Sequence, residues 1–303
     1  MMGEDSPIKG LHVFSTGIGS IHTEHRYGTR LPQMWWVLFS RNWVEVPINV
    51  FVLEHPEGLI LFDAGLDTAV LTNPNYVDSA IGRFFMRRLF RLRLRPDETL
   101  TNKLAGLGFS AADVRKVVVS HLHFDHVGGI AEVPQADLLV SHNEWAQLSG
   151  SHPERDFIFR DHVQRPDARW QFVDFGHTDD PLLAPFGGCY DVMNDGSLIL
   201  LPTPGHTPGS ISMLARIKGR APVLLIGDLA YAADLPMKDQ LPDTGDKAQL
   251  LASYAKVRGL KQRLPELIIL PSHDFAVQEH LSSSIAHQDA AADRSTAARF
   301  SAG

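Results

Sequence analysis

Residues 114–129 place the strongest constraint on what this chain can fold into. The stretch begins with a valine-rich run typical of a buried strand and continues with His121, His123, Asp125 and His126. This combination of imidazole and carboxylate suits zinc, iron, cobalt or manganese better than calcium or magnesium. The alternative, ordinary surface or core histidines, is disfavoured by four ligand-type side chains within six positions. The stretch therefore predicts a metal site at the end of a strand.

The spacing inside this stretch agrees with an extended backbone. Side chains alternate between the two faces of a strand, so His121 and His123 are expected to point the same way and to hold one ion. Asp125 and His126 are expected on the turn that follows, where a pair of glycines permits backbone conformations that other residues resist.

Three later apolar runs also end in residues that bind metals, namely His206, Asp228 and His273. If these strands share one sheet with the first, their ends bring all seven side chains together. Zinc commonly takes three or four protein ligands and a water, so seven ligands suit two ions better than one. The natural division gives the first ion His121, His123 and His206, gives the second Asp125, His126 and His273, and makes Asp228 the bridge.

Composition sets the remaining limits. The chain has 303 residues, 44% hydrophobic and 21% charged, with no stretch that reads as a linker, so one domain over residues 1–303 is expected. A net charge of −7 disfavours a nucleic-acid partner, which would require a basic face. The single cysteine, Cys189, excludes an intramolecular disulfide and a multi-thiolate metal site. With no signal-like start and no long apolar run, a soluble cytoplasmic protein without stable membrane association is expected.

Upstream of the motif, residues 46–63 are expected to form a two-stranded hairpin that turns at residues 55–58. Asp63, at its end, either orients a ligand histidine or caps the strand, and its position in the sequence leaves both open.

Two clusters precede this hairpin. An aromatic cluster is expected in the core, with the lining of an apolar pocket as the alternative, and comprises Trp35, Trp36, Phe39 and Trp43. A polar cluster is expected to be a solvated loop, with the rim of a site as the alternative, and comprises His22, His25, Arg26 and Tyr27.

Three further segments stand apart. Residues 76–95 carry six arginines among apolar residues and predict an amphipathic helix followed by a strand or coil. Its role is a lid over an apolar substrate, a homodimer contact or a membrane-surface element, with a plain solvated helix as the alternative. Residues 150–188 are expected to be an irregular insertion that covers the site, with His152, His162 and His177 on the surface. Residues 282–303 are expected to be a weakly held tail.

The motifs together resemble a known family. The pattern His-x-His-x-Asp-His-x-Gly-Gly at 121–129, with Gly-His-Thr-Pro-Gly at 205–209, Gly-Asp at 227–228 and Ser-His at 272–273, is similar to the metallo-β-lactamase superfamily over roughly residues 45–275. The resemblance implies an α/β fold, a four-layer αββα sandwich of the metallo-β-lactamase type, with a dinuclear site at one edge. Within the superfamily it is strongest for the acyl-homoserine lactonase branch, whose tyrosine three positions after the bridging aspartate is matched by Tyr231.

This resemblance implies a dinuclear metal-dependent hydrolase that opens a lactone ring. The leading substrate is an N-acyl homoserine lactone, a small molecule with an apolar acyl chain, whose hydrolysis is called quorum quenching. Two divalent ions, zinc first and iron, cobalt or manganese as alternatives, are expected to hold a hydroxide that attacks the ring carbonyl. Tyr231 is expected to donate to the developing oxyanion, and Asp125 to pass a proton to the departing oxygen.

The sequence disfavours some of the other activities known for this fold and leaves others open. A cysteine-ligand β-lactamase needs Cys in place of Asp228, a redox di-iron member usually carries Glu in place of His123, and a nuclease needs a basic groove. The ligands do not separate hydrolysis of another lactone, of a thioester as in glyoxalase II, of an aryl ester or of a phosphotriester. A non-catalytic metal-binding protein is the remote alternative, because such proteins generally lose ligands and this chain keeps all seven.

Overall fold

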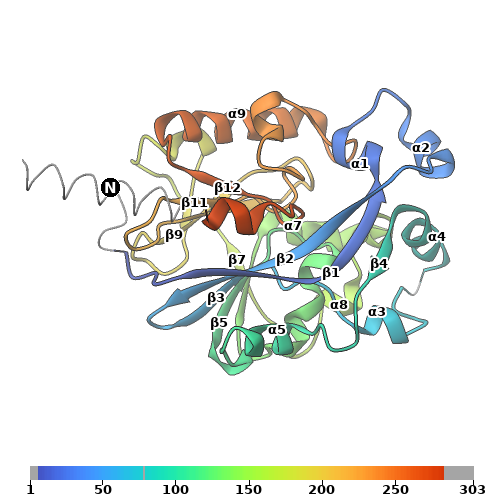
Figure 1. Cartoon of the computed structure of the whole chain (residues 1–303), viewed down its shortest axis with the longest axis horizontal. Helices are drawn as coiled ribbons and strands as arrows, with labels where there is room; N and C mark the ends of the chain where they lie inside the picture. The colour runs from blue at the N-terminus through green and yellow to red at the C-terminus, as the bar shows by residue number, and fades with distance from the viewer. Residues whose placement is uncertain (1–5, 78, 283–303) are drawn as a thin grey trace, which may run out of the picture.

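The computed structural model describes residues 6–77 and 79–282, which form two facing β-sheets with helices on both outer sides (Figure 1). The larger sheet has seven strands. Its first four strands pair antiparallel, and the rest pair parallel. In order across the sheet they are β4 (Arg91–Arg93), β1 (Leu11–His22), β2 (Trp43–His55), β3 (Gly58–Phe62), β5 (Val114–Val118), β6 (Asp137–Ser141) and β7 (Arg169–Val173).

The smaller sheet has five strands and comes from the second half of the chain. Its strands pair antiparallel except for one parallel pair, β11 with β12. In order they are β12 (Ile268–Leu270), β11 (Val223–Leu225), β10 (Ile211–Ala215), β9 (Leu198–Pro202) and β8 (Tyr190–Asp191).

Strand β2 shows how the sequence builds the layers. Its successive side chains alternate between faces, so Phe51 and Leu53 enter the core between the two sheets. Val50 and Val52 enter a second core, which the larger sheet shares with α5 (Leu100–Gly106). Because both faces are covered, this part of β2 is a continuous apolar run rather than an alternating one.

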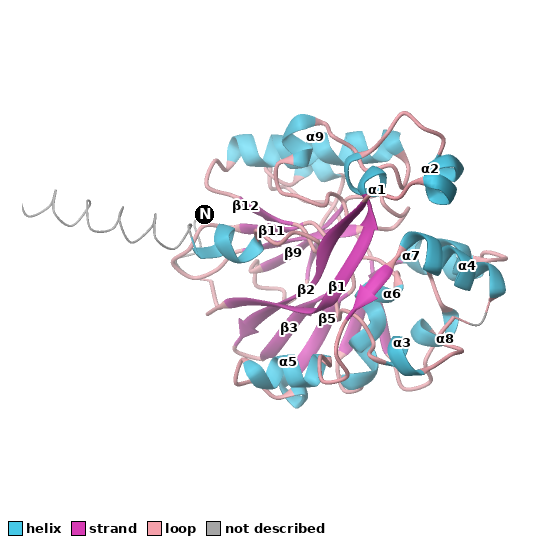
Figure 2. Cartoon of the chain, turned by 45° about the vertical axis from the view of Figure 1, so that its right-hand side comes forward, coloured by secondary structure: helices cyan, strands magenta, loops and turns pink. Residues whose placement is uncertain are grey.

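A third core joins the smaller sheet to α9 (Lys247–Arg263), whose Leu250, Tyr254 and Val257 pack on that sheet. Asp246 caps this helix by accepting from the backbone N–H groups of residues 248 and 249. Figure 2 shows α9 outside one sheet and α5 outside the other, which confirms the four-layer αββα sandwich. The remaining α-helices are α1 (Thr23–Tyr27), α2 (Gln33–Phe39), α3 (Ala69–Thr72), α4 (Ala80–Leu89), α6 (Phe124–Val127), α7 (His142–Ala146) and α8 (Arg160–Val163).

Several expectations about local structure are met and others are not. The hairpin at 46–63 is present, and residues 76–95 form helix α4 followed by strand β4. The expected insertion at 150–188 is partly wrong, because it supplies edge strand β7 of the larger sheet. The expected tail lies outside the described residues apart from residue 282. Among the described helices, none has both the length and the apolar character needed to cross a membrane.

Candidate metal centre and substrate pocket

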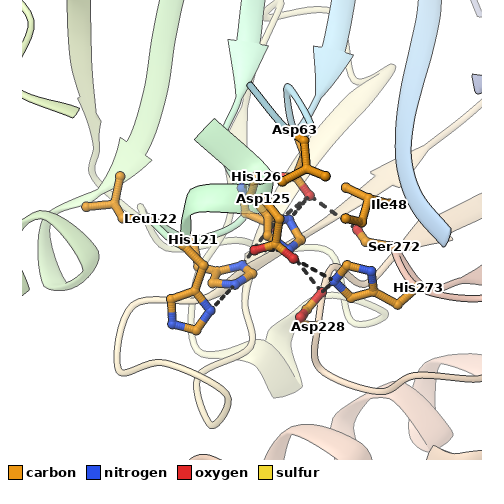
Figure 3. Close-up of polar contacts among 12 residues, drawn as sticks. Ile48, Asp63, His121, Leu122, Asp125, His126, Asp228, Ser272 and His273 are labelled. Atoms are coloured by element: carbon orange, nitrogen blue, oxygen red, sulfur yellow. Dashed lines mark hydrogen bonds and ion pairs between the residues drawn. The ribbon is translucent and has the colours of Figure 1, made fainter. Parts of the chain in front are cut away.

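The seven predicted ligands lie together, in the segments that follow β5, β9, β11 and β12. Figure 3 labels five of them: His121, Asp125, His126, Asp228 and His273. The four strands do not share one sheet, because β5 belongs to the larger sheet and the other three belong to the smaller. The side chains therefore converge from both sheets. Three groups have ligand atoms within 4.8 Å of one another: His121, His123 and His206; His121, His126 and Asp228; Asp125, His126 and His273.

The histidines of the central motif lie beyond the strand rather than on it. Strand β5 ends at Val118, and Asp125 falls within helix α6 instead of a turn. The strand ends early because carboxylates take the backbone donors that follow. The N–H of Ser120 donates to Asp63 Oδ1 at 2.7 Å, and that of Leu122 donates to Glu144 Oε1 at 2.9 Å.

The first ligand group is built from three converging imidazole nitrogens. His123 Nδ1 lies 2.9 Å from His121 Nε2 and 3.1 Å from His206 Nε2. A neutral imidazole has one N–H and one lone pair, so three such nitrogens pointing at each other satisfy one another poorly. A cation between them would satisfy all three lone pairs, and the donor set therefore fits a divalent metal.

Asp63 determines which ring nitrogens face this centre. It is fully buried, and its Oδ2 accepts from Ser120 Oγ at 3.0 Å and from His126 Nδ1 at 2.8 Å. Because the single hydroxyl proton of Ser120 goes to Asp63, its oxygen must accept from His121 Nδ1, which lies 2.9 Å away. Both histidines are thereby left with an Nε2 lone pair directed away from Asp63. The structure thus favours the orienting role over the strand cap.

The third imidazole is oriented by the backbone. His273 Nδ1 lies 2.7 Å from the carbonyl oxygen of Pro47, which can only accept, so Nδ1 carries the proton and Nε2 the lone pair. That Nε2 lies 3.1 Å from Asp228 Oδ1. Asp228 Oδ1 and His126 Nε2 are buried 3.3 Å apart, yet neither makes a hydrogen bond of acceptable geometry among the described residues. Buried polar atoms that lack a hydrogen-bond partner in this way fit the role of metal ligands.

Glu144 joins the two segments that carry the first ligand group. It is not among the site residues predicted from the sequence, yet it is fully buried. Its Oε1 accepts from the Leu122 N–H, and its Oε2 accepts from Thr207 Oγ1 at 2.6 Å and from the Gly209 N–H at 3.2 Å. The carboxylate therefore ties the His121–His123 segment to the loop that carries His206.

Tyr231 lies at the same centre, with its ring stacked on His273 at a centroid distance of 5.6 Å. Its hydroxyl is 2.9 Å from His25 Nε2. The expectation of a solvated loop at His25 and Arg26 is wrong, because α1 turns both side chains inward to Tyr231, and His25 is only 5% exposed. The polar residues around His25 predicted a solvated loop, but its hydrogen-bond partner lies more than two hundred positions away in the sequence.

Burial controls the charge state of this pair. It is the largest influence on His25, whose pKa falls to about 3, so the imidazole is neutral at physiological pH. Burial also raises the pKa of the Tyr231 phenol well above 10, with Asp228 and Asp125 acting in the same direction. The phenol therefore keeps its proton and can donate it.

A pocket of about 510 Å³ opens over this centre. Its floor includes His123, Asp125 and Tyr231, and its wall is largely apolar. Residues 76–95 contribute to the wall, as do residues 155–157 of the expected insertion. The apolar wall includes Ile21, Met34, Val37, Phe85, Leu89 and Leu92.

The peripheral aromatic and histidine predictions have mixed outcomes. Trp36 is fully buried, as expected for core, but Trp35 and Phe39 are 53% and 61% exposed, which corrects the expectation for them. His152 and His177 are exposed as expected. His162 is instead partly buried against the ring of Tyr76, at a centroid distance of 4.3 Å.

Two facing sheets that carry clustered histidines and aspartates beneath an apolar pocket define the class of metal-dependent hydrolases. Residues 43–273 match the metallo-β-lactamase superfamily, and the chain belongs to this superfamily.

Relatives refine this assignment. A protein from Rhizobium radiobacter named N-acyl homoserine lactonase AttM is 33% identical over 226 residues, covering 70% of this chain and 78% of the relative. A Bacillus protein named N-acyl homoserine lactonase is 25% identical over 228 residues, covering 75% and 78%. A solved N-acyl homoserine lactone hydrolase, with N-hexanoyl-L-homoserine bound at its catalytic metal centre, shares the fold with a TM-score of 0.72 at 20% identity, over 90% of this chain and 96% of that one. The resemblance to the lactonase branch is confirmed.

Proposed function

We propose that this protein is a metal-dependent lactonase that opens the ring of N-acyl homoserine lactones. The observation that carries the proposal is the placement of Tyr231 and the His/Asp cluster on the floor of one pocket whose wall is apolar. A lactone ring on this floor would leave its acyl chain against the wall. The relatives named N-acyl homoserine lactonase, at 31–33% identity, support the same substrate class.

Seven residues would hold two divalent ions, with zinc the leading candidate because imidazole and carboxylate donors suit it. When bound, such a pair supplies a nucleophilic hydroxide at neutral pH and polarises the scissile carbonyl. The first ion would take His121, His123 and His206, the second Asp125, His126 and His273, and Asp228 would lie between them.

The chain's own residues then act on protons. The Tyr231 hydroxyl keeps its proton and would donate a hydrogen bond to the oxygen that gains negative charge. An Asp125 carboxylate oxygen lies 3.5 Å from His273 Nε2 at the floor of the pocket, where it would carry a proton to the departing ring oxygen.

The apolar wall would receive the acyl chain. Many of the residues that line this wall belong to α2, α4, β1 and β4. Helices and strands rather than loops therefore shape much of the wall. Its volume lies within the usual range for small-molecule sites. Val37, Phe85 and Leu89 line this wall, so acyl-chain selection would fall to them.

A substrate panel on the zinc-loaded protein tests the proposal. Lactone opening releases an acid, so a pH-stat assay would follow acyl-homoserine lactones of several chain lengths, an unsubstituted lactone, a thioester, an aryl ester, a β-lactam and a phosphotriester. We expect the highest kcat/KM for an acyl-homoserine lactone and loss of activity after chelation. A higher kcat/KM for another class, or full activity in metal-free protein, would overturn the proposal.

Gly19 offers a sharper test of the wall. A Cβ at this position would lie 3.5 Å from Val46 Cγ2, an ordinary contact, and it would face two lining residues, Val46 and Ile48. Gly19→Val should therefore narrow the pocket without backbone strain and lower kcat/KM for long acyl chains about tenfold more than for short ones, since several methylenes lose their contacts. Gly259→Ala, in the open on α9, is the matched control. Equal losses at all chain lengths would place the acyl chain elsewhere.

A further inference from the structure

We infer that His25 is a positioning residue for the reaction: its Nε2–H donates to the Tyr231 hydroxyl oxygen, so that the phenol proton points away from His25, toward the metal centre and the substrate. The inference rests on the proposed function for its chemistry, but its geometry stands independently. His25 lies on α1, and His25 and Tyr231 both line the pocket.

His25 and Tyr231 are joined by a hydrogen bond and by a contact between their rings. His25 Nε2 lies 2.9 Å from the Tyr231 oxygen, and the two rings meet edge to face at a centroid distance of 5.4 Å. The neighbouring Arg26 donates from its guanidinium to the Tyr231 carbonyl oxygen at 3.2 Å. Two consecutive residues of one helix therefore hold both the hydroxyl and the backbone of Tyr231.

Helix α1 is itself fixed in place. The His25 carbonyl oxygen accepts from the Asp243 N–H at 3.2 Å, and Asp243 Oδ2 accepts from Trp36 Nε1 at 2.6 Å. The His25 ring also contacts the rings of Trp36 and Phe90. Because packing and hydrogen bonds hold α1 from several sides, the imidazole can define a single direction for the phenol.

Proton counting selects the direction of the hydrogen bond. A phenol has one proton, so if Tyr231 donates to His25, none is left for an oxyanion. If His25 donates instead, the Tyr231 oxygen is held as an acceptor and its proton is directed to the metal-centre side, where Asp228 accepts it and an oxyanion of the substrate can take its place. The neutral His25 imidazole supplies that donor with the proton on Nε2. Its Nδ1 is then a lone pair, consistent with a buried atom that has no hydrogen-bond partner among the described residues.

A double-mutant cycle in the zinc-loaded enzyme tests the coupling. His25→Phe keeps an aromatic ring but removes the donor, and we expect kcat to fall about tenfold with KM changed less than about twofold. In a Tyr231→Phe background the same change should cost less than about twofold, because the group it acts through is gone. His25→Gln, which retains a donor, should recover part of kcat. An equal fold-loss in both backgrounds would overturn the inference.

A spectroscopic measurement separates this inference from the proposed function. In ¹⁵N spectra of the zinc-loaded protein, the His25 ring should show the Nε2–H tautomer, and Tyr231→Phe should shift its Nε2 resonance. A wild-type ring protonated on Nδ1 would refute the inference, whatever substrate the enzyme accepts. Absence of lactone hydrolysis with the Nε2–H tautomer present would instead refute the proposed function alone.

His55→Phe is the matched control for these variants. His55 is a similarly buried histidine, hydrogen-bonded through Nε2 to Asp195 Oδ2 at 2.9 Å, but it does not line the pocket. It should leave kcat and the His25 resonances unchanged. Should His25→Phe fail to fold, His25→Gln and the wild-type tautomer still decide the question.

Discussion

Replacing Asp63 by Asn should lower either the affinity of the metal centre for zinc or the free energy of unfolding. Asp63 has a positive φ of 63°, a conformation that Asn tolerates better than most residues, so the backbone is not strained by the change. The carboxylate accepts four hydrogen bonds: two from Ser120, one from His126 and one from Ser272 Oγ at 3.2 Å. An amide cannot accept on its nitrogen, so at least one of these donors must face another donor.

The two orientations of the new amide have different consequences. With its nitrogen toward the Ser120 N–H, a buried donor loses its partner, which costs about 1–3 kcal/mol of folding free energy. With its nitrogen toward His126 Nδ1, that histidine must move its proton to Nε2, the atom expected to bind metal. Loss of such an orienting partner typically lowers metal affinity about 10- to 100-fold.

Zinc affinity measured by competition with a chromophoric chelator, together with urea unfolding of the metal-free protein, separates the two outcomes. Asp195→Asn is the matched control, because Asp195 also accepts from a histidine, His55, but lies outside the pocket lining. Its zinc affinity should be unchanged. If Asp63→Asn left both zinc affinity and unfolding free energy at their wild-type values, the orienting role assigned to Asp63 would be refuted.

Two other predictions follow from buried groups. Glu144→Ala removes the acceptor of the Leu122 and Gly209 N–H groups, so the free energy of unfolding in urea should fall by about 3 kcal/mol or more. A fall of less than about 1 kcal/mol would show that the carboxylate does not join the two segments. Burial raises the pKa of the Tyr76 and Tyr254 phenols well above 10, so in the folded protein these groups stay protonated where the unfolded chain ionises. Their contribution to stability is therefore complete below pH 10 and declines as pH rises above it, and absorbance at 295 nm should show them ionising only with alkaline unfolding; titration of all tyrosines before unfolding would contradict this.

Much of the metal centre can be predicted from the sequence because several of its ligands lie close together along the chain. The short-range pattern from His121 to His126 needs only one strand end, and His206, Asp228 and His273 each follow a recognisable apolar run. The assignment of the strands to two separate sheets cannot be predicted in this way. Both sheets are covered on both faces, so β9 and the end of β5 at residues 117–118 are both short buried apolar runs, and nothing in either run identifies the neighbouring strands.

His25 could not be found from its surroundings. The sequence around it is polar and glycine-flanked, which is typical of a loop, and its burial depends on Tyr231 and Asp243, far along the chain. A similar argument applies to Trp35 and Trp36 on one short helix: the first is exposed and the second is buried, and periodicity over seven residues is too brief to predict which of them faces inward. Tertiary contacts, rather than local preference, decide both cases.

Part of the pocket lining comes from outside the segment that matches the superfamily. The predicted ligands and Tyr231 fall inside residues 43–273, the part that matches the superfamily, whereas Ile21, His25 and Met34 precede it. Substitutions at Ile21 or Met34 can therefore alter which acyl chains fit the pocket without touching any predicted metal ligand.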